Sequence, residues 1–397
     1  CSSRMQLRAL VVVVCVGCSA ALRHGLPVLN RPPSCRQWPR MAIELPRYAP
    51  TIEGEICGDR AVGGQTYEEQ FKEVFARELT TSKPLRKPRP ARASDPGAKR
   101  IPFSNVWGTL MRSPFSKDRT WVSTDVGRLL FFAFNHGVGI FAPVLFFSWH
   151  QLGLHFLLYC ASGMGITYSY HRQLAHRSFK SKKWLEYLAC TCGMLAMQGG
   201  PIEWVSDHRY HHLHTETALD PHSSYEGFYW SHLGWMLDAE VYEARCSDRS
   251  NVQDLQKQAF YRLVQGQYLP FVLAHYGLFY ALGGLPALCW RCFATTVLHH
   301  VTWFVNSAAH TWGKQDYATG DQSRNNWWVG WLAFGEGWHN NHHAFEYSAR
   351  HGLRARQFDI TWLFIRGFQK LGLVSNVKLP TEAAKRRLAL SSTNDAA

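Results

Sequence analysis

Nine histidines lie in four short motifs whose spacing suits metal binding. The motifs are His171-Arg172-Gln173-Leu174-Ala175-His176, His208-Arg209-Tyr210-His211-His212, Asn306-Ser307-Ala308-Ala309-His310 and His339-Asn340-Asn341-His342-His343. When His-x-x-His-His lies on a helix, steps of three and four residues return to the same side, so each such motif presents three imidazoles together. Two histidines five residues apart do not share a face of an α-helix, and this spacing suits a point where a helix ends.

Nine neutral imidazoles are too many for one four-coordinate zinc ion, but they suit two transition-metal ions with open positions for oxygen. We therefore predict a dinuclear iron site. Asn306 lies four residues before His310, on the same face of a helix, and could bind through its amide oxygen or through a water molecule.

The remaining histidines fall into two classes. We expect the isolated ones to be ordinary structural residues, namely His24, His136, His150, His155, His275 and His351. A supporting, tunnel-lining or structural role stays open for His214, His222, His232, His299 and His300.

Several other kinds of chemistry are not expected from the motifs. Glu336-x-x-His339 is half of the signature of soluble, carboxylate-rich di-iron bundles, but the chain has no second copy. The zinc-protease motif His-Glu-x-x-His and the glycine-rich phosphate-binding loops do not occur. The basic, proline-rich stretch 82–100 lacks interleaved aromatic residues, so we interpret it as a linker beside a membrane and expect no nucleic acid as a partner.

Long apolar stretches must position these motifs. Residues 129–149 and 151–170 contain no Asp, Glu, Lys or Arg, and each is long enough to cross a bilayer, with a break at His150 and Gln151. A second pair is predicted at 268–282 and 287–309, separated by Gly283-Gly284-Leu285-Pro286. Because a helical hairpin crosses twice, all four histidine motifs return to one membrane face. Residues 184–201 either cross the membrane or lie in its interface.

Composition and the N-terminal segment narrow the class further. The 397 residues carry a net charge of +14 and are 46% hydrophobic, which excludes a disordered or collagen-like chain, and the 11 scattered cysteines are expected to be reduced. Residues 1–41 combine a signal-like apolar stretch with a basic tract free of acidic residues, so we predict a plastid address, with entry into the endoplasmic reticulum as the alternative.

The motifs HRQLAHRSF, WVSDHRYHHLHTETALDPHS, WFVNSAAHTWG and GEGWHNNHHAFEYSARHGL resemble the histidine boxes of integral-membrane fatty acyl desaturases. The resemblance is greatest to the plant and algal branch of the stearoyl-CoA desaturase type and extends over residues 105–381. The expected organisation is then a targeting segment at 1–41, a polar region with a basic linker at 42–104, the desaturase domain at 105–381 and a polar tail at 382–397.

The resemblance implies an all-α membrane protein, in which four transmembrane helices in two hairpins carry a helical cytosolic or stromal cap. It implies two iron ions (Fe²⁺), with O₂ as co-substrate. The ligands carried over are His171, His176, His208, His211, His212, His310, His339, His342 and His343, with Asn306 acting through water. Thr302 and Trp303 are candidates to line a kinked substrate tunnel, or else pack in the fourth span.

The expected reaction removes one hydrogen from each of two adjacent carbons of an acyl-CoA or acyl-lipid, leaving a cis double bond at Δ9. The alternatives are Δ7 or another front position on a plastid glycolipid, a related hydroxylase, and a membrane metal transporter. No cytochrome b5 or flavin motif is present in the sequence, so we expect a separate electron donor, either ferredoxin or cytochrome b5 with its reductase. The basic region 350–397 suits an acidic donor, CoA or a lipid headgroup.

Overall fold

The computed structural model describes residues 121–217 and 219–390. The predicted targeting segment and linker, and the first residues of the expected desaturase domain, lie outside this range. The described chain is almost entirely helical. Its longer helices are α4 (Ser123–Gly139), α6 (Trp149–Met164), the π-helix η1 (Gly165–Ala175), α7 (Lys183–Met194), α8 (Pro201–His214), α13 (Tyr268–Asn306) and α17 (Ile360–Lys370).

Shorter elements connect these helices. The helices are α5 (Phe141–Leu145), η2 (Ser224–Glu226), α9 (Phe228–His232), η3 (Gly234–Leu237), α10 (Ala239–Cys246), η4 (Ser250–Val252), α11 (Gln253–Gln256), α12 (Ala259–Gly266), α14 (Ala308–Thr311), α15 (Trp327–Leu332), α16 (His339–Ala344) and α18 (Glu382–Leu388). The strands β1 (Lys180–Ser181) and β2 (Val374–Ser375) pair antiparallel. This pairing fixes the C-terminal segment beside the chain that follows the first histidine motif.

The first predicted pair of stretches is helical, but its helices begin and end at other residues than expected. α4 begins at Ser123, before the predicted residue 129, because the buried carboxylate of Asp125 accepts the Val122 N–H at 3.2 Å and the Ala239 N–H at 2.7 Å. The break lies at 146–148, and His150 is in the first turn of α6. Polar residues are tolerated there because the first N–H groups of a helix have no partner within the helix.

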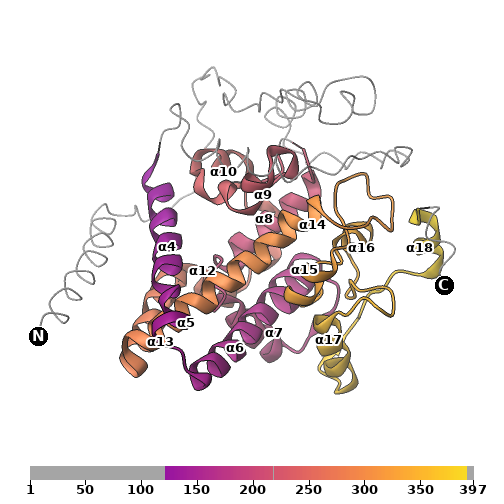
Figure 1. Ribbon diagram of the computed structural model, residues 1–397. Coiled ribbons are helices and arrows are strands. Elements are labelled where there is room, and N and C mark those ends of the chain that lie inside the picture. Colours follow the sequence, from indigo (N-terminus) through magenta and orange to yellow (C-terminus); the bar gives the residue numbers. More distant parts are fainter. Residues whose placement is uncertain (1–120, 218, 391–397) are drawn as a thin grey trace, which may run out of the picture. The chain divides into compact units, whose positions relative to one another are not determined.

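The second predicted pair is the single element α13, bent inside. Gly284 has φ 62° and ψ −155°, a conformation that glycine adopts without the steric cost of a side chain, and Pro286 follows it. The predicted break at 283–286 is therefore confirmed. At its other end α13 stops at Asn306, earlier than the predicted residue 309, and α14 begins after Ser307. Figure 1 shows α8, α14 and α16 near one another at this end of α13.

Two stretches of the described chain are long and apolar enough to cross a membrane, Ser123–Leu145 and Tyr268–Thr311. The segment 149–175 combines α6 with η1 and is less uniformly apolar. The four crossings predicted from the sequence therefore remain a prediction. The sequence left open whether the segment that contains α7 crosses the membrane. The histidines before α7 and those after it lie together in one group, so α7 does not place them apart.

The π-helix explains the spacing of the first motif. In a π-helix each hydrogen bond joins residues five apart, and here the His176 N–H donates to the His171 carbonyl at 3.1 Å. The two imidazole centroids consequently lie 4.8 Å apart. The expectation that the helix ends at this motif is confirmed, since His176 is the C-terminal cap of η1. A wider helical turn, which the sequence analysis did not consider, brings the two side chains together.

The core behind the histidine motifs lies between η1, α7 and α8. Tyr170 and Leu174 of η1 pack with Cys190 of α7 and with Ile202 and Val205 of α8. The backbones approach most closely at Gly165 and Gly193, where a Cβ atom on Gly165 would lie 2.1 Å from the Gly193 nitrogen. This contact sets the distance between the helix that carries His171 and its neighbour.

Gly165→Ala should destabilise the protein, because an alanine methyl group cannot rotate away from the Gly193 backbone. We expect a loss of about 1–3 kcal/mol, measured as a lower midpoint of thermal unfolding in detergent. Gly153→Ala in α6 is the matched control, since no atom lies within 4 Å of its added carbon. The control should be neutral or stabilising by up to about 1 kcal/mol. Equal midpoints for the two variants would contradict this account of the contact.

Candidate metal centre

The nine clustered histidines meet in two groups. Five of them form one group, His171, His176, His208, His212 and His342. Four form the other, His211, His310, His339 and His343. Within each group the side chains offer one ring nitrogen each, all within 4.8 Å of one another. We refer to these as the five-histidine and the four-histidine group.

Each His-x-x-His-His motif supplies both groups. On α8 the pair His208 and His212 joins the five-histidine group, and His211 joins the other. On α16 the pair His339 and His343 belongs to the four-histidine group, and His342 to the five-histidine group. Residues four apart remain side by side on a helix, whereas adjacent residues point about 100° apart. The spacing predicted that all three imidazoles of a motif lie together, and the structure instead divides them between the two groups.

The ring nitrogens of each group face one another at short distances. His342 Nε2 lies 2.9 Å from His212 Nε2 and 3.2 Å from His171 Nε2. His339 Nε2 lies 3.0 Å from His310 Nε2 and 3.1 Å from His343 Nε2. A neutral imidazole whose Nδ1 carries the proton has only a lone pair at Nε2, so several such atoms cannot converge favourably without a cation between them. This arrangement fits a bound metal ion in each group.

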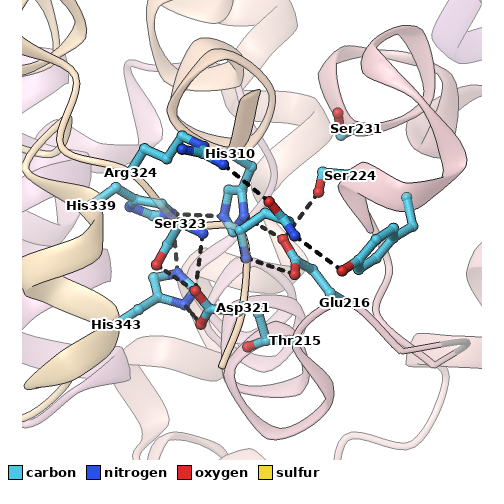
Figure 2. A network of polar contacts seen from close by, with 12 residues as sticks. Thr215, Glu216, Ser224, Ser231, His310, Asp321, Ser323, Arg324, His339 and His343 are labelled. Carbon is cyan, nitrogen blue, oxygen red and sulfur yellow. Dashed lines mark hydrogen bonds and ion pairs between the residues drawn. The ribbon is translucent and has the colours of Figure 1, made fainter. Parts of the chain in front are cut away.

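Carboxylates fix the orientation of four of these rings from behind. The Nδ1 atoms of His211, His310 and His343 each lie 2.9 Å from a carboxylate oxygen, of Asp220, Glu216 and Asp321 respectively. His171 Nδ1 lies 2.8 Å from Glu336 Oε2. Such pairs hold the proton on Nδ1, orient the ring and raise the basicity of the other nitrogen. Figure 2 shows Glu216 and Asp321 on either side of His310, with His339 and His343 nearby.

Buried charges around Glu336 form a compact network. Arg172, which is fully buried, donates from Nε to Glu336 Oε1 and from Nη1 to Asp359 Oδ2, each at 3.0 Å. His351 Nδ1 lies 2.8 Å from Glu336 Oε2, and its ring centroid is 4.4 Å from that of His342. His351, expected to be an ordinary structural histidine, shares this carboxylate with His171 and so lies directly beside the five-histidine group. The lone spacing of His351 in the sequence gave no signal of this contact.

The environment keeps five of the nine imidazoles neutral, whereas the hydrogen bond with Glu216 raises the pKa of His310 despite its burial. Burial, and then the neighbouring imidazoles, lowers the pKa of His176, His208, His212, His339 and His342 well below the usual value. Burial opposes ionisation of Glu336, but Arg172, His351 and His171 hold the pKa of this carboxyl well below its ordinary value.

Two carboxyl groups that contact the four-histidine group, Asp321 and Glu216 in Figure 2, differ in the direction in which their pKa is shifted. Burial alone would raise the pKa of Asp321, but His343 lowers it strongly. For Glu216, burial raises the pKa despite the bond with His310.

The two predicted tunnel residues lie on α13. Thr302 Oγ1 accepts a hydrogen bond from Gln198 Nε2 at 2.8 Å, a contact that the sequence analysis did not anticipate. Trp303 is 4% exposed and packs with Phe132 and Leu237. The indole also contacts three imidazole rings, of His232, His299 and His300. The packing alternative is therefore observed for Trp303, and a tunnel-lining role stays a prediction.

Of the histidines whose role was left open, His222 lies beside the four-histidine group, whereas His232 and His300 lie beside Trp303, and His300 contacts His136, which was expected to be structural. His222 stacks beside His211, with ring centroids 4.3 Å apart. His136, His300 and His232 form a row joined by two contacts of 2.9 Å, and His232 Nδ1 lies 2.9 Å from Ser307 Oγ. Asn306 is half-buried at the end of α13, four residues before His310.

A pocket of about 510 Å³ reaches both groups. Its wall includes His176 of the five-histidine group and His343 of the four-histidine group, together with Arg177, Arg209 and Tyr347. The pocket therefore brings one histidine of each group to the wall of a single cavity.

Comparison with known proteins identifies the family. The fatty acid desaturase family model matches residues 147–357. A chloroplastic palmitoyl-monogalactosyldiacylglycerol delta-7 desaturase of Arabidopsis thaliana is 46% identical over 304 residues, which cover 76% of this chain and 82% of the relative. Delta-9 acyl-lipid desaturase 2 of the same plant is 47% identical over 274 residues, 69% of this chain and 89% of the relative. An acyl-CoA C20 Delta5-desaturase of Anemone leveillei is 44% identical over 291 residues, 73% of this chain and 93% of the relative.

The chain therefore belongs to the membrane fatty acid desaturase family, in the plant acyl-lipid and acyl-CoA branch. It is a fatty acid desaturase whose buried histidine groups are consistent with a two-metal site. The resemblance seen in the histidine motifs is confirmed.

Arg172→Gln should strongly destabilise the protein, because it leaves the buried carboxylates of Glu336 and Asp359 without their cation. Breaking such a buried pair costs about 3–5 kcal/mol, to be measured by thermal unfolding in detergent. Arg177→Gln is the matched control, because the Arg177 side chain is 61% exposed and its ion pair with Asp254 lies in solvent. That pair should contribute less than about 1 kcal/mol. A similar midpoint for both variants would refute the role given to Arg172.

Proposed function

We propose that this desaturase introduces a cis double bond into a saturated acyl chain, using two iron ions held by the nine histidines. His171, His176, His208, His212 and His342 would hold one ion, and His211, His310, His339 and His343 the other, with Asn306 binding through a water molecule. The convergence of Nε2 lone pairs in two adjacent groups is the observation that carries this proposal. Imidazole ligands suit iron among other transition metals.

Iron ions bound there would supply the O₂-dependent chemistry needed to take hydrogen from an unactivated methylene, which no side-chain acid or base can do. The chain's own residues prepare the site. Asp220, Glu216, Asp321 and Glu336 hold the Nδ1 protons of their histidines and so aim the opposite nitrogens inward. Arg172 keeps Glu336 ionised and in place.

The position of the new double bond is proposed as Δ9, with Δ7 on the palmitate of a plastid glycolipid as the alternative. The relatives support both readings, since one is a delta-9 acyl-lipid desaturase and another a chloroplastic delta-7 enzyme. Thr302 and Trp303 would line the bend of the substrate tunnel. The hydrogen bond from Gln198 to Thr302 supports this assignment because it holds the Thr302 side chain of α13 against the segment that precedes α8.

The membrane arrangement is proposed to comprise four crossings, with the segment 149–170 and the two parts of α13 joining α4. Exposed apolar side chains support this, since Trp149 is 78% exposed at the start of α6 and Leu282 is 80% exposed before the bend of α13. Such surfaces are stable when they face lipid. The plastid is favoured because two relatives are described as chloroplastic, and the endoplasmic reticulum is the alternative.

Electrons would come from a separate protein, ferredoxin in a plastid or cytochrome b5 with its reductase in the endoplasmic reticulum. The pocket lined by His176 and His343 supports entry of electrons from the cap side. Arg177 at its rim, 61% exposed, would favour an acidic donor. The substrate would be an acyl-lipid or acyl-CoA drawn from the membrane.

The proposal is tested by expressing the full chain in a desaturase-deficient host supplied with both donor systems, and locating double bonds in the fatty acids by mass spectrometry. We expect new monoenes that fall at least about 100-fold in His342→Ala, since ligand loss costs no less than loss of a supporting contact. His150→Ala, an exposed histidine outside both groups, should keep full activity.

Other products would point elsewhere. Hydroxylated acyl chains would identify the related hydroxylase, and metal flux without acyl products would revive the transporter. No new monoene from a well-expressed chain with both donors would contradict desaturation of ordinary acyl chains. A fluorescent fusion of the full chain should coincide with plastids, and an endoplasmic reticulum pattern would overturn the favoured compartment.

A further inference from the structure

The two histidine groups differ sharply in the carboxylates that touch them. Three of the four imidazoles in the four-histidine group have a carboxylate oxygen 2.9 Å behind Nδ1, from Asp220, Glu216 and Asp321. Among the residues that the structure describes, two carboxylates approach the five-histidine group. Glu336 contacts His171 at 2.8 Å, and the partly exposed Glu346 lies 3.5 Å from His212. The number of close, buried carboxylates is therefore three on one side and one on the other.

The three carboxylates of the four-histidine group are held by local hydrogen bonds. Asp220 accepts the Glu216 N–H at 2.7 Å and the His222 N–H at 3.1 Å. Asp321 accepts the Ser323 N–H at 2.9 Å and the Thr319 hydroxyl at 2.7 Å.

Glu216 is held in a similar way. It accepts the Ser224 hydroxyl at 3.0 Å and the Gln322 N–H at 2.8 Å (Figure 2). Neutral donors such as these orient a carboxylate without cancelling its charge.

Glu336, the single buried carboxylate at the five-histidine group, is paired with a cation. Two guanidinium nitrogens of Arg172 lie 3.0 Å from Glu336 Oε1, so a positive charge sits against this carboxylate on the side away from His171. Asp359 shares the same guanidinium but contacts none of the nine imidazoles. The negative charge that reaches the five-histidine group is consequently weaker.

Burial strengthens the contrast. All four members of the four-histidine group are buried, whereas His176 and His208 of the other group are half-exposed. An uncompensated charge is costly in a buried site, and opposite charges attract more strongly where water is excluded. A divalent cation should gain most where three carboxylates stand behind its ligands.

We propose that the two metal positions are unequal, and that Asp220, Glu216 and Asp321 make the four-histidine group the tighter site. This inference rests on the proposed metal centre and adds an order of filling and release to it. The five-histidine group has one more imidazole ligand, which favours metal binding there. That ligand is neutral, however, and each supporting carboxylate changes metal affinity by about 10–100-fold. The four-histidine group then keeps its ion when the five-histidine group has lost its own.

The test follows iron release from the purified, iron-loaded full chain in detergent, as the concentration of a chelator is raised under nitrogen. Iron per chain should fall in two steps of one ion each, separated at least about 10-fold in chelator concentration. Asp321→Asn should move the later, tighter step about 10–100-fold toward lower chelator and leave the earlier step in place. Glu336→Gln is the matched control, and it should move the earlier step instead.

Two ligand variants assign the steps. His171→Ala, in the five-histidine group, should retain the tight step alone, and His310→Ala should retain only the weak step. Asp220→Asn provides a second charge removal if Asp321→Asn proves too unstable to purify. Each variant's thermal midpoint is recorded beside its release curve, because a general loss of structure would lower both steps together.

Three results would overturn the inference. These are a single release step for both ions, a tight step that is lost in His171→Ala and kept in His310→Ala, and equal shifts of both steps in Asp321→Asn and Glu336→Gln. Each leaves the metal centre itself intact. A chain that retains no iron at all would instead refute the metal centre together with the inference, so the two failures are distinguishable.

Discussion

The structure depends on one unfavourable juxtaposition, the meeting of imidazole lone pairs at about 3 Å inside the protein. His342 Nε2 faces two other Nε2 atoms in one group, and His339 Nε2 faces two in the other. Neutral rings that carry their proton on Nδ1 repel one another in this arrangement unless a cation lies between them. The surrounding fold supplies the rigidity that keeps them in place, and a metal ion would turn the repulsion into coordination.

That rigidity comes from features unlike ordinary helix packing. A π-helix brings His171 and His176 onto one side, and the close backbone contact of Gly165 with Gly193 fixes its position. Buried carboxylates then hold the rings from behind, and these in turn need compensation. Arg172 provides it for Glu336, while hydrogen bonds from neutral groups orient Asp220 and Asp321. The imidazoles are thus oriented by carboxylates, and the carboxylates are in turn held by Arg172 or by neutral hydrogen-bond donors.

The sequence was informative where spacing alone decides the outcome. Four motifs, two apolar hairpins and the rule that a hairpin crosses twice were enough to predict that the histidines converge, and they do. The break at Gly284 was also predictable, because glycine followed shortly by proline interrupts a helix. The assignment of His211 and His212 to different groups was not anticipated, although the angle between adjacent helical residues contains this information.

Other features depend on contacts between distant segments. Glu336 was noticed only as half of another family's motif, and its bond to His171 joins residues 171 and 336 across the fold. His351 looked isolated for the same reason. The break lies at 146–148, where Ser148 is extended, and the polar His150 is already helical, so polarity alone did not locate it. The contact between Gln198 and Thr302 is likewise a tertiary one.

The central claim, that two groups of imidazoles hold two iron ions, is tested most directly by iron quantification combined with X-ray absorption at the iron edge on the purified full-length protein. The account predicts two iron ions per chain, with a coordination shell dominated by imidazole nitrogen. Fewer than two ions in a fully loaded, folded preparation, or a shell dominated by carboxylate oxygen, would contradict it.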